Sequence, residues 1–170
     1  MKHSIVGLVL AFSLAVASPA VAQDSFNNDT MIFEFTEATI TPVLLNRGIT
    51  VTSRDVNSDG NVYLDVNFAN GQTGRISFTA KLDGTEKRIG MAVAISFIPP
   101  AEWPDQRKID LINEFNRQYW LTQVTMAENG EIYIMRYSVC DFGAPQGNIN
   151  SELWSFESLA KKLQDELDKD

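Results

Sequence analysis

Alternation of apolar and polar residues between positions 62 and 97 most constrains how this chain folds. One side of the alternation holds Val62, Leu64, Val66 and Phe68, then Ile76, Phe78, Ala80 and Leu82, then Ile89, Met91, Val93, Ile95 and Phe97. Dipeptides that tolerate the positive φ of tight turns occur at Asp59-Gly60, Asn70-Gly71, Asp83-Gly84 and Asn129-Gly130. This pattern predicts half-buried antiparallel strands connected as a meander.

A calcium loop is the alternative interpretation of the first turn, because residues 55–60 (DVNSDG) alternate acidic and amide side chains ahead of a glycine. Calcium loops of the helix–loop–helix type need a bidentate carboxylate at their twelfth position. Counted from Asp55, that position is Val66, and the nearest acid, Asp65, lies roughly 13 Å beyond Asn61 along an extended strand. We therefore predict a hairpin and no metal site, with an incomplete cation site as the alternative.

Three more strands complete the prediction. Residues 49–57 form a less regular strand, since Val51 and Val56 fall out of phase, and a bulge is the simplest account. Residues 120–128 and 131–139 pair as a hairpin across Asn129-Gly130. The other side of the 89–97 strand carries only the small residues Gly90, Ala92, Ala94 and Ser96. Such residues let a partner backbone or a helix of the same chain approach closely, and we favour the helix.

Three helices frame these strands. The first covers residues 37–47, with Thr36 as N-cap and Gly48 as its stop, although Pro42 favours a later start near Thr39 or Thr41. The second covers 105–119 and has an apolar stripe of Ile109, Ile112, Phe115 and Tyr119. The third follows a cap at Asn150 or Ser151 and has a stripe of Ile149, Leu153, Phe156, Ala160, Leu163 and Leu167.

The predicted order is therefore α-β-β-β-β-α-β-β-α. It describes an α+β fold in which three helices pack against an antiparallel sheet made of a meander and a hairpin. The stripe of the third helix needs a partner, either the sheet or a second copy of the chain, and we favour the sheet.

The N-terminus has the features of an export signal. Lys2 precedes an apolar run, Ile5 to Ala17, that is too short to span a bilayer, and Ala20-Val21-Ala22 gives the small-x-small pattern of a cleavage site. We expect residues 1–22 to be removed, residues 23–35 to form an N-terminal extension and residues 36–168 to form one domain. The mature protein would be periplasmic or secreted without membrane insertion; an uncut N-terminal anchor is the alternative.

Charge and the rarest side chains exclude several function classes. The chain has 22 acidic against 14 basic residues, which makes nucleic acid an unlikely partner. The lone Cys140 cannot form an intramolecular disulfide and is expected to be buried. The only histidine, His3, leaves with the signal, so the mature chain has no Ser-His-Asp or Cys-His machinery and no imidazole for zinc. We expect no metal and no cofactor.

Several segments resemble the YbjN family. The resemblance covers roughly residues 31–168 and is carried by Thr36…Ile40…Leu44…Gly48, by INEFNR (112–117), and by MAENGEIYIMRYSV (126–139) leading into DFGAPQGNIN and a long terminal helix. The resemblance implies a bacterial sensory-transduction regulator with a fold similar to type III secretion chaperones. Some family members carry a cysteine pair where this chain has residues 83–88, DGTEKR, so a role of those thiols does not transfer.

The Asn-x-x-Asn helix is the most specific element of this resemblance. Asn113 and Asn116 near a helix end can satisfy loop backbone, which is a structural role. Alternatively, Asn113, Asn116 and Arg117 form a recognition point for a peptide or small ligand, with Arg117 as the charged anchor. Trp103, Trp120 and Trp154 are expected in the core, whereas an exposed pair would mark a binding surface.

Two function classes follow. The resemblance implies a non-enzymatic, exported, chaperone-like binding module that holds a polypeptide partner through a sheet face, sheet edge or helix groove, as a monomer or a homodimer. A periplasmic hydrolase with paired carboxylates is the alternative, although no two acids stand in a recognisable catalytic setting. A small-ligand-binding protein also remains open.

Overall fold

The structure, a computed structural model, describes residues 25–169 of the chain. Its elements are β1 (Met31–Ile32), α1 (Glu37–Asn46), β2 (Thr50–Val56), β3 (Val62–Asn67), β4 (Thr73–Lys81), β5 (Arg88–Phe97), α2 (Asp105–Gln118), β6 (Gln123–Met126), β7 (Ile132–Val139), β8 (Ala144–Pro145) and α3 (Gln146–Leu167). Six strands form one antiparallel sheet in the order β2-β3-β4-β5-β7-β6, and β1 pairs with β8 in a separate small sheet. The predicted α+β fold is confirmed.

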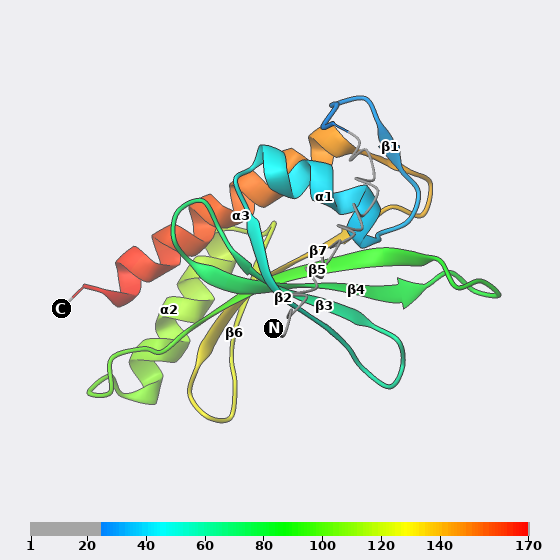
Figure 1. The fold of residues 1–170 in the computed structure, drawn as a ribbon. Helices are drawn as coiled ribbons and strands as arrows, with labels where there is room; N and C mark the ends of the chain where they lie inside the picture. Colours follow the sequence, from blue (N-terminus) through cyan, green and yellow to red (C-terminus); the bar gives the residue numbers. More distant parts are fainter. Residues whose placement is uncertain (1–24, 170) are drawn as a thin grey trace, which may run out of the picture.

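All three helices lie on one side of the six-stranded sheet (Figure 1). We call this side the inner face and the other side the outer face. The apolar residues predicted to point inward from the central strands are buried, as in Leu64 and Val66 of β3, Ile76 and Phe78 of β4, and Met91, Val93, Ile95 and Phe97 of β5. The whole apolar stripe of α3 is buried in the same core, which confirms that it packs within its own chain.

The small residues of β5 have a different environment from the predicted one. Their alternation with the buried residues places Ala92, Ala94 and Ser96 on the outer face, which none of the described helices covers. The preference for a helix of the same chain against this stripe is therefore wrong. The small side chains instead leave the middle of the outer face shallow.

Helix α1 begins at Glu37 in spite of Pro42. Thr36 and Thr39 form a reciprocal capping box, in which the Thr39 N–H donates to the Thr36 hydroxyl oxygen and the Thr36 N–H donates to that of Thr39. The cap fixes the first turn, so the later starts at Thr39 or Thr41 are wrong. The β2–β3 pairing shifts register between Val51 and Ser53, which confirms the predicted bulge.

Other boundaries differ from the prediction. Strand β6 has four residues instead of nine, because the chain turns after α2, where the Thr122 N–H donates to the Tyr119 carbonyl at 3.2 Å. Helix α3 starts at Gln146, directly after Pro145, and has no side-chain cap, so neither Asn150 nor Ser151 caps it. Pro145 occupies the N-cap position in an extended conformation, with φ −60° and ψ 141°.

Single side chains also differ from the prediction. Ile109 is exposed although the apolar stripe of α2 includes it. Of the tryptophans, Trp103 is buried as predicted, with Arg107 stacked 3.6 Å from its ring centroid, but Trp120 and Trp154 are exposed.

Residues 25–35 are packed against the domain. Ile32 and Phe35 are buried, and the Phe35 ring stacks on Phe78 of β4 with centroids 6.5 Å apart. The Asn27 N–H donates to Gln146 Oε1 at 3.1 Å, which ties this segment to the start of α3. The predicted signal peptide, residues 1–22, lies outside the described residues. Among residues 25–169, no helix combines the length and the apolar character needed to cross a bilayer.

Candidate functional site

The second half of β7 has a neighbouring strand on one side only. Strand β6 pairs with β7 only from Met126 opposite Ile132 to Gln123 opposite Met135. Residues 136–139 of β7 therefore have β5 on one side and no described strand on the other. We call residues 136–139 the open edge.

The hydrogen-bond pattern shows which groups point outward from the open edge. The Cys140 N–H donates to the Ile89 carbonyl of the β5 side at 2.9 Å. In an antiparallel strand, backbone groups alternate between the two neighbours, so those of Ser138 and Arg136 also face β5. The N–H and C=O groups of Tyr137 and Val139 must then face the open side, which leaves two donors and two acceptors for a further strand.

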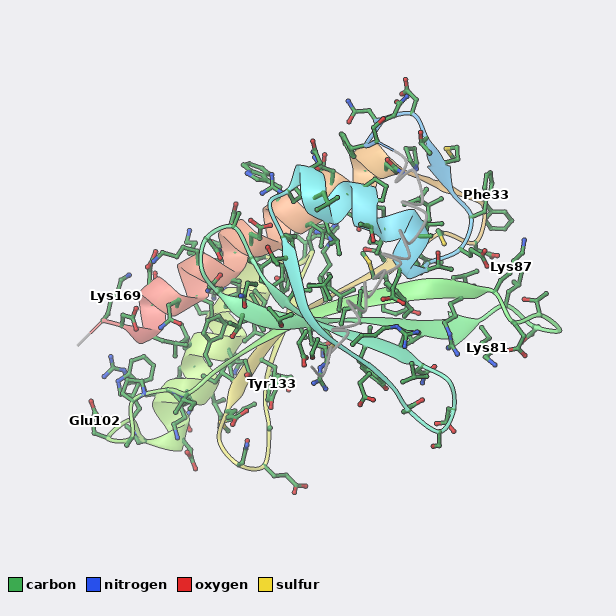
Figure 2. All side chains as sticks on the ribbon, viewed as in Figure 1. Phe33, Lys81, Lys87, Glu102, Tyr133 and Lys169 are labelled. Carbon is green, nitrogen blue, oxygen red and sulfur yellow. The ribbon has the colours of Figure 1, made fainter. Side chains whose placement is uncertain are left out.

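Apolar side chains surround the open edge. Tyr137 and Val139 are 50% and 53% exposed on the outer face, and Phe142, just beyond the strand, is 93% exposed. Trp120, in the turn before β6, is 82% exposed. Figure 2 shows Phe33 at the neighbouring corner, and this side chain lies so close to Gly143 that a Cβ on the glycine would be 2.7 Å from Phe33 Cε1. Exposed aromatic side chains of this kind are typical of protein-binding surfaces.

The inner side of the open edge is polar and charged. The Ser138 hydroxyl donates to a carboxylate oxygen of Glu152 on α3, and Arg136 Nη2 lies 3.5 Å from the other oxygen of that carboxylate. Arg136 Nε and Nη1 are buried without a hydrogen-bond partner among the described residues. The contacts of Glu152 attach β7 to α3, so the strand is held in place although one edge is free.

The three predicted binding residues do not act as one group. Asn116 Nδ2 donates to the Val124 carbonyl, and its Oδ1 accepts from the Val124 N–H, both at 2.8 Å. These bonds attach α2 to β6 and occupy the Asn116 amide. Asn113 and Arg117 are exposed on the same helix, and Arg117 pairs with Glu114. A recognition role for Asn113, Asn116 and Arg117 stays a prediction, for which Asn113 and Arg117 offer the accessible groups.

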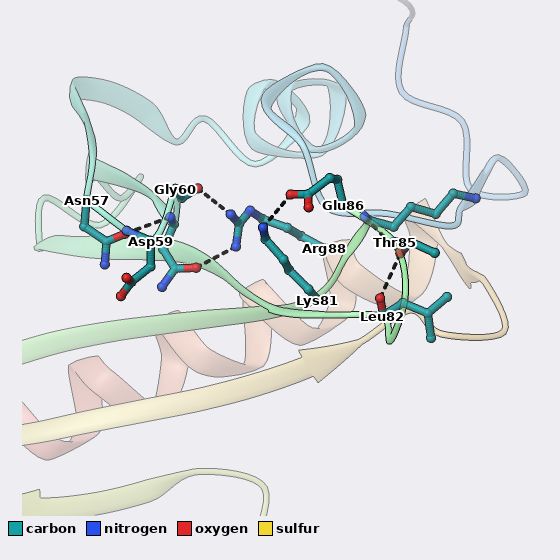
Figure 3. A network of polar contacts seen from close by, with 10 residues as sticks. Asn57, Asp59, Gly60, Lys81, Leu82, Thr85, Glu86 and Arg88 are labelled. Carbon is teal, nitrogen blue, oxygen red and sulfur yellow. Dashed lines mark hydrogen bonds and ion pairs between the residues drawn. The ribbon is translucent and has the colours of Figure 1, made fainter.

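The first turn of the meander is the predicted hairpin. Asn57 Oδ1 accepts from the N–H groups of Asp59 at 3.0 Å and Asn61 at 2.8 Å, while Gly60 has a φ of 73° (Figure 3). Arg88 of β5 donates to the Gly60 carbonyl and to the Asn61 side chain. Thus the amide that a calcium loop would use as a ligand holds the turn instead. In the part of the chain that the structure describes, no three His, Cys, Asp or Glu side chains gather to hold a metal.

The open edge has no signal in the sequence. Residues 118–122, QYWLT, contain no glycine, proline or turn-forming amide, and their aromatic and β-branched side chains suit a strand. The chain turns early because Asn116 bonds the backbone of Val124 and so fixes Val124 opposite Ile134.

Comparison with known protein families gives one result. A family model described as YbjN, putative bacterial sensory transduction regulator, matches residues 37–169. The chain belongs to the YbjN family. Comparisons with curated proteins and with solved structures find no match. YbjN membership supports a regulatory or binding role and agrees with a fold whose accessible features are a strand edge and exposed aromatic side chains.

Proposed function

We propose that this YbjN protein is an exported, non-enzymatic binding module that holds an extended segment of a polypeptide partner at the open edge of β7. The observation that carries the proposal is that Tyr137 and Val139, whose backbone groups point away from β5, pair with no strand among residues 25–169 on that side. An extended peptide placed there would continue the line of β6 and form up to four backbone hydrogen bonds.

Backbone hydrogen bonds alone do not select a partner, so the side chains around the edge supply the selectivity. Residues of the peptide that point to the outer face meet Tyr137 and Val139, which favours apolar side chains at alternate positions. Residues that point to the inner face meet the Glu152 carboxylate and the Arg136 guanidinium, which favours polar side chains. The proposed partner segment is therefore amphipathic with a period of two.

The charge of the protein adds a preference at longer range. Its formal net charge is −8, and its acidic residues outnumber the basic ones by 22 to 14. Such a surface attracts basic segments and repels acidic ones over a distance of about 10 Å at ordinary salt concentration. We expect the partner segment to be neutral or basic.

The non-enzymatic part of the proposal rests on the contacts and pKa shifts of Asp65 and Cys140. Asp65, one of the isolated acids, is engaged by Arg75 and Ser53 at 2.7 and 2.6 Å. The Arg75 hydrogen bond, followed by that of Ser53, lowers the pKa of the Asp65 carboxyl, which is the opposite of what a general acid needs. Cys140 is buried, and burial raises the pKa of its thiol to about 11, which does not suit a nucleophile.

Export rests on the N-terminal sequence and has its own test. Mass spectrometry of the protein isolated from the periplasmic fraction should show a chain that begins at Gln23. A chain that begins at residue 1 and stays in the cytoplasmic fraction would contradict export, without affecting the proposed binding at the open edge.

Photo-crosslinking in intact cells tests the binding. A photoreactive residue at position 137 should capture a partner, and the same residue at position 51, on the opposite sheet edge, should not. Val139→Pro removes an outward N–H and should abolish capture at position 137, while Val139→Ala keeps the N–H and should retain it. Equal capture from positions 137 and 51, or capture that survives Val139→Pro, would contradict a strand-addition site.

A further inference from the structure

The outer face of the sheet contains a depression that the open edge does not explain. It has a volume of about 410 Å³ and crosses β3, β4 and β5, with Thr52 at one end and Tyr133 at the other. This volume lies within the range of small-molecule sites. The depression lies on the opposite side of the sheet from α1 and α3, where Figure 2 shows Tyr133.

The strand register explains the shape of the depression. Ala94 lies opposite Arg75 on one neighbouring strand and Met135 on the other, and Ser96 lies opposite Tyr133 of β7. Small side chains on β5 between longer ones on both sides produce a low floor with raised walls. Two residues of the stripe predicted from the sequence, Ala94 and Ser96, thus form the bottom of a site on the outer face.

A charge pair forms one wall and is fixed in position. Arg75 Nε lies 2.7 Å from Asp65 Oδ1, and the Ser53 hydroxyl donates to Asp65 Oδ2 at 2.6 Å. The Arg75 guanidinium carbon also lies 5.7 Å from the centroid of the Tyr63 ring. These contacts fix the guanidinium while its two terminal nitrogens form no hydrogen bond to a described residue. The opposite charges cancel, so the wall is polar without a net charge.

The remaining polar groups of the depression are neutral. The side chains of Asn67, Thr73 and Ser96 form no side-chain hydrogen bond within the described residues, and each can both donate and accept. On the far side, the Tyr133 hydroxyl donates to Glu131 Oε2 at 2.6 Å, which holds the ring along the other wall. A ligand would therefore meet hydroxyl and amide groups below and an aromatic ring at one side.

We propose that this depression binds a saccharide. Planar side chains with two polar atoms each, here Asp65, Asn67 and the guanidinium of Arg75, match the spacing of neighbouring hydroxyl groups on a sugar ring. The low floor at Ala94 lets a ring with its C–H groups approach the sheet, and Tyr133 offers an apolar surface beside it. A neutral site gives no advantage to phosphate groups, and its polar lining does not suit an acyl chain.

The site is open on one side, which limits its affinity. A ligand on an open sheet face keeps much of its surface in water, so we expect dissociation constants in the millimolar range. Binding at the depression is separate from strand addition at the open edge, because the two use different side chains and share only strand β7, at positions 133 and 136–139.

NMR titration of the isotope-labelled protein tests the proposal. Glucose, N-acetylglucosamine and maltose, each added to about 50 mM, cover the millimolar range in which open sites bind. At least one of the three sugars should shift the amide resonances of Asn67, Thr73 and Ser96 in a saturable way. No shift from any of the three sugars, or shifts that map outside the depression, would overturn the proposal.

Two matched variants and one competing ligand complete the experiment. Ala94→Phe fills the floor and should weaken binding at least tenfold, whereas Ala92→Phe, one position along the same face, lies outside the depression and should not change it. Equal losses in the two variants would overturn the assignment to this site. Sodium phosphate is the competing probe, and larger shifts of the same amides with phosphate than with sugars would identify an anion site instead.

Discussion

The two edges of the six-stranded sheet differ in how they are protected. On the β2 side the sheet ends in a strand whose seven residues are all exposed, yet this strand carries a bulge and directs Arg54 to the inner face, where its Nε lies 2.6 Å from Glu37 Oε2 of α1. On the other side, β6 is too short to cover β7, and the open edge of residues 136–139 has neither a bulge nor a charged side chain on its outer face.

Bulges and inward-pointing charges are common protections against edge-to-edge pairing, because a strand that adds there must bend and must bury a charge. The β2 edge has both protections, although it is longer. The open edge has an inner-face charge, that of Arg136, but no bulge, and its free backbone groups number only four. This difference indicates that accessibility alone does not make a binding edge, and that the shorter edge is the one suited to accept a strand.

Proline substitutions at adjacent positions test the difference most directly. Ser138→Pro removes an N–H that faces β5 and the hydroxyl that binds Glu152, so we expect the free energy of unfolding to fall by about 3–5 kcal/mol. Tyr137→Pro removes an N–H that faces the open side. It should lower the free energy of unfolding by at most about 1 kcal/mol more than Tyr137→Ala does. Urea unfolding of both proline variants, with Ser138→Ala and Tyr137→Ala as controls, measures these changes. Equal proline penalties would mean that residues 136–139 are paired on both sides.

Loss of the Asn116 amide should widen the open edge. Asn116→Ala leaves the Val124 N–H and C=O groups without their partner, and each lost bond to a partly buried group costs about 1–2 kcal/mol. We expect the free energy of unfolding to fall by about 3 kcal/mol and hydrogen exchange to accelerate in β6. Asn113→Ala, on the exposed side of the same helix, should change stability by less than about 0.5 kcal/mol. Unchanged exchange in β6 after Asn116→Ala would show that other contacts hold the strand.

A feature of the fold can be predicted from the sequence where the contacts that determine it are local. The meander is predictable because alternation and turn residues act between neighbours, as in Asn57, which closes the first hairpin with its own side chain. The family resemblance implies the same kind of fold, and the family match agrees with it.

The errors arise where distant contacts override local preference. The strand-like residues 120–122 form a turn because Asn116 positions β6, and α3 begins ahead of its predicted caps because residues 27–28 dock on Gln146 and Gly147. The open edge depends on where two strands stop relative to each other, and the saccharide depression depends on the register of four strands. Neither can be read from the spacing of residues within a single segment.

Thiol labelling of Cys140 tests how firmly the end of the open edge is held. Cys140 follows Val139 directly, but its N–H is bonded to β5 and its side chain is buried. Since the pKa of the thiol is raised to about 11, labelling by iodoacetamide at pH 8 should be roughly 200-fold slower than in the unfolded chain. Because the pKa of the thiol is raised in the folded state, its contribution to the free energy of unfolding is fully present below about pH 8.5 and is lost as the pH rises towards 11. The free energy of unfolding of Cys140→Ala should not show this decline. Rapid labelling at pH 8 would mean that the whole end of β7 opens, which would remove the rigid template that strand addition needs.

Removal of the inward charge from β2 should make the two edges alike. Arg54→Val deletes a largely exposed ion pair with Glu37, so the free energy of unfolding should change by less than about 1 kcal/mol. The variant strand would then present only apolar side chains, those of Val51, Val56 and the substituted position, beside the apolar groove between α1 and β2. We expect light scattering to show concentration-dependent self-association of Arg54→Val, and not of Asp55→Val, which changes the outer face of the same strand. A monomeric Arg54→Val protein would show that the bulge at Val51 and Ser53 protects this edge without help from the charge, and the contrast with the open edge would then rest on strand shape alone.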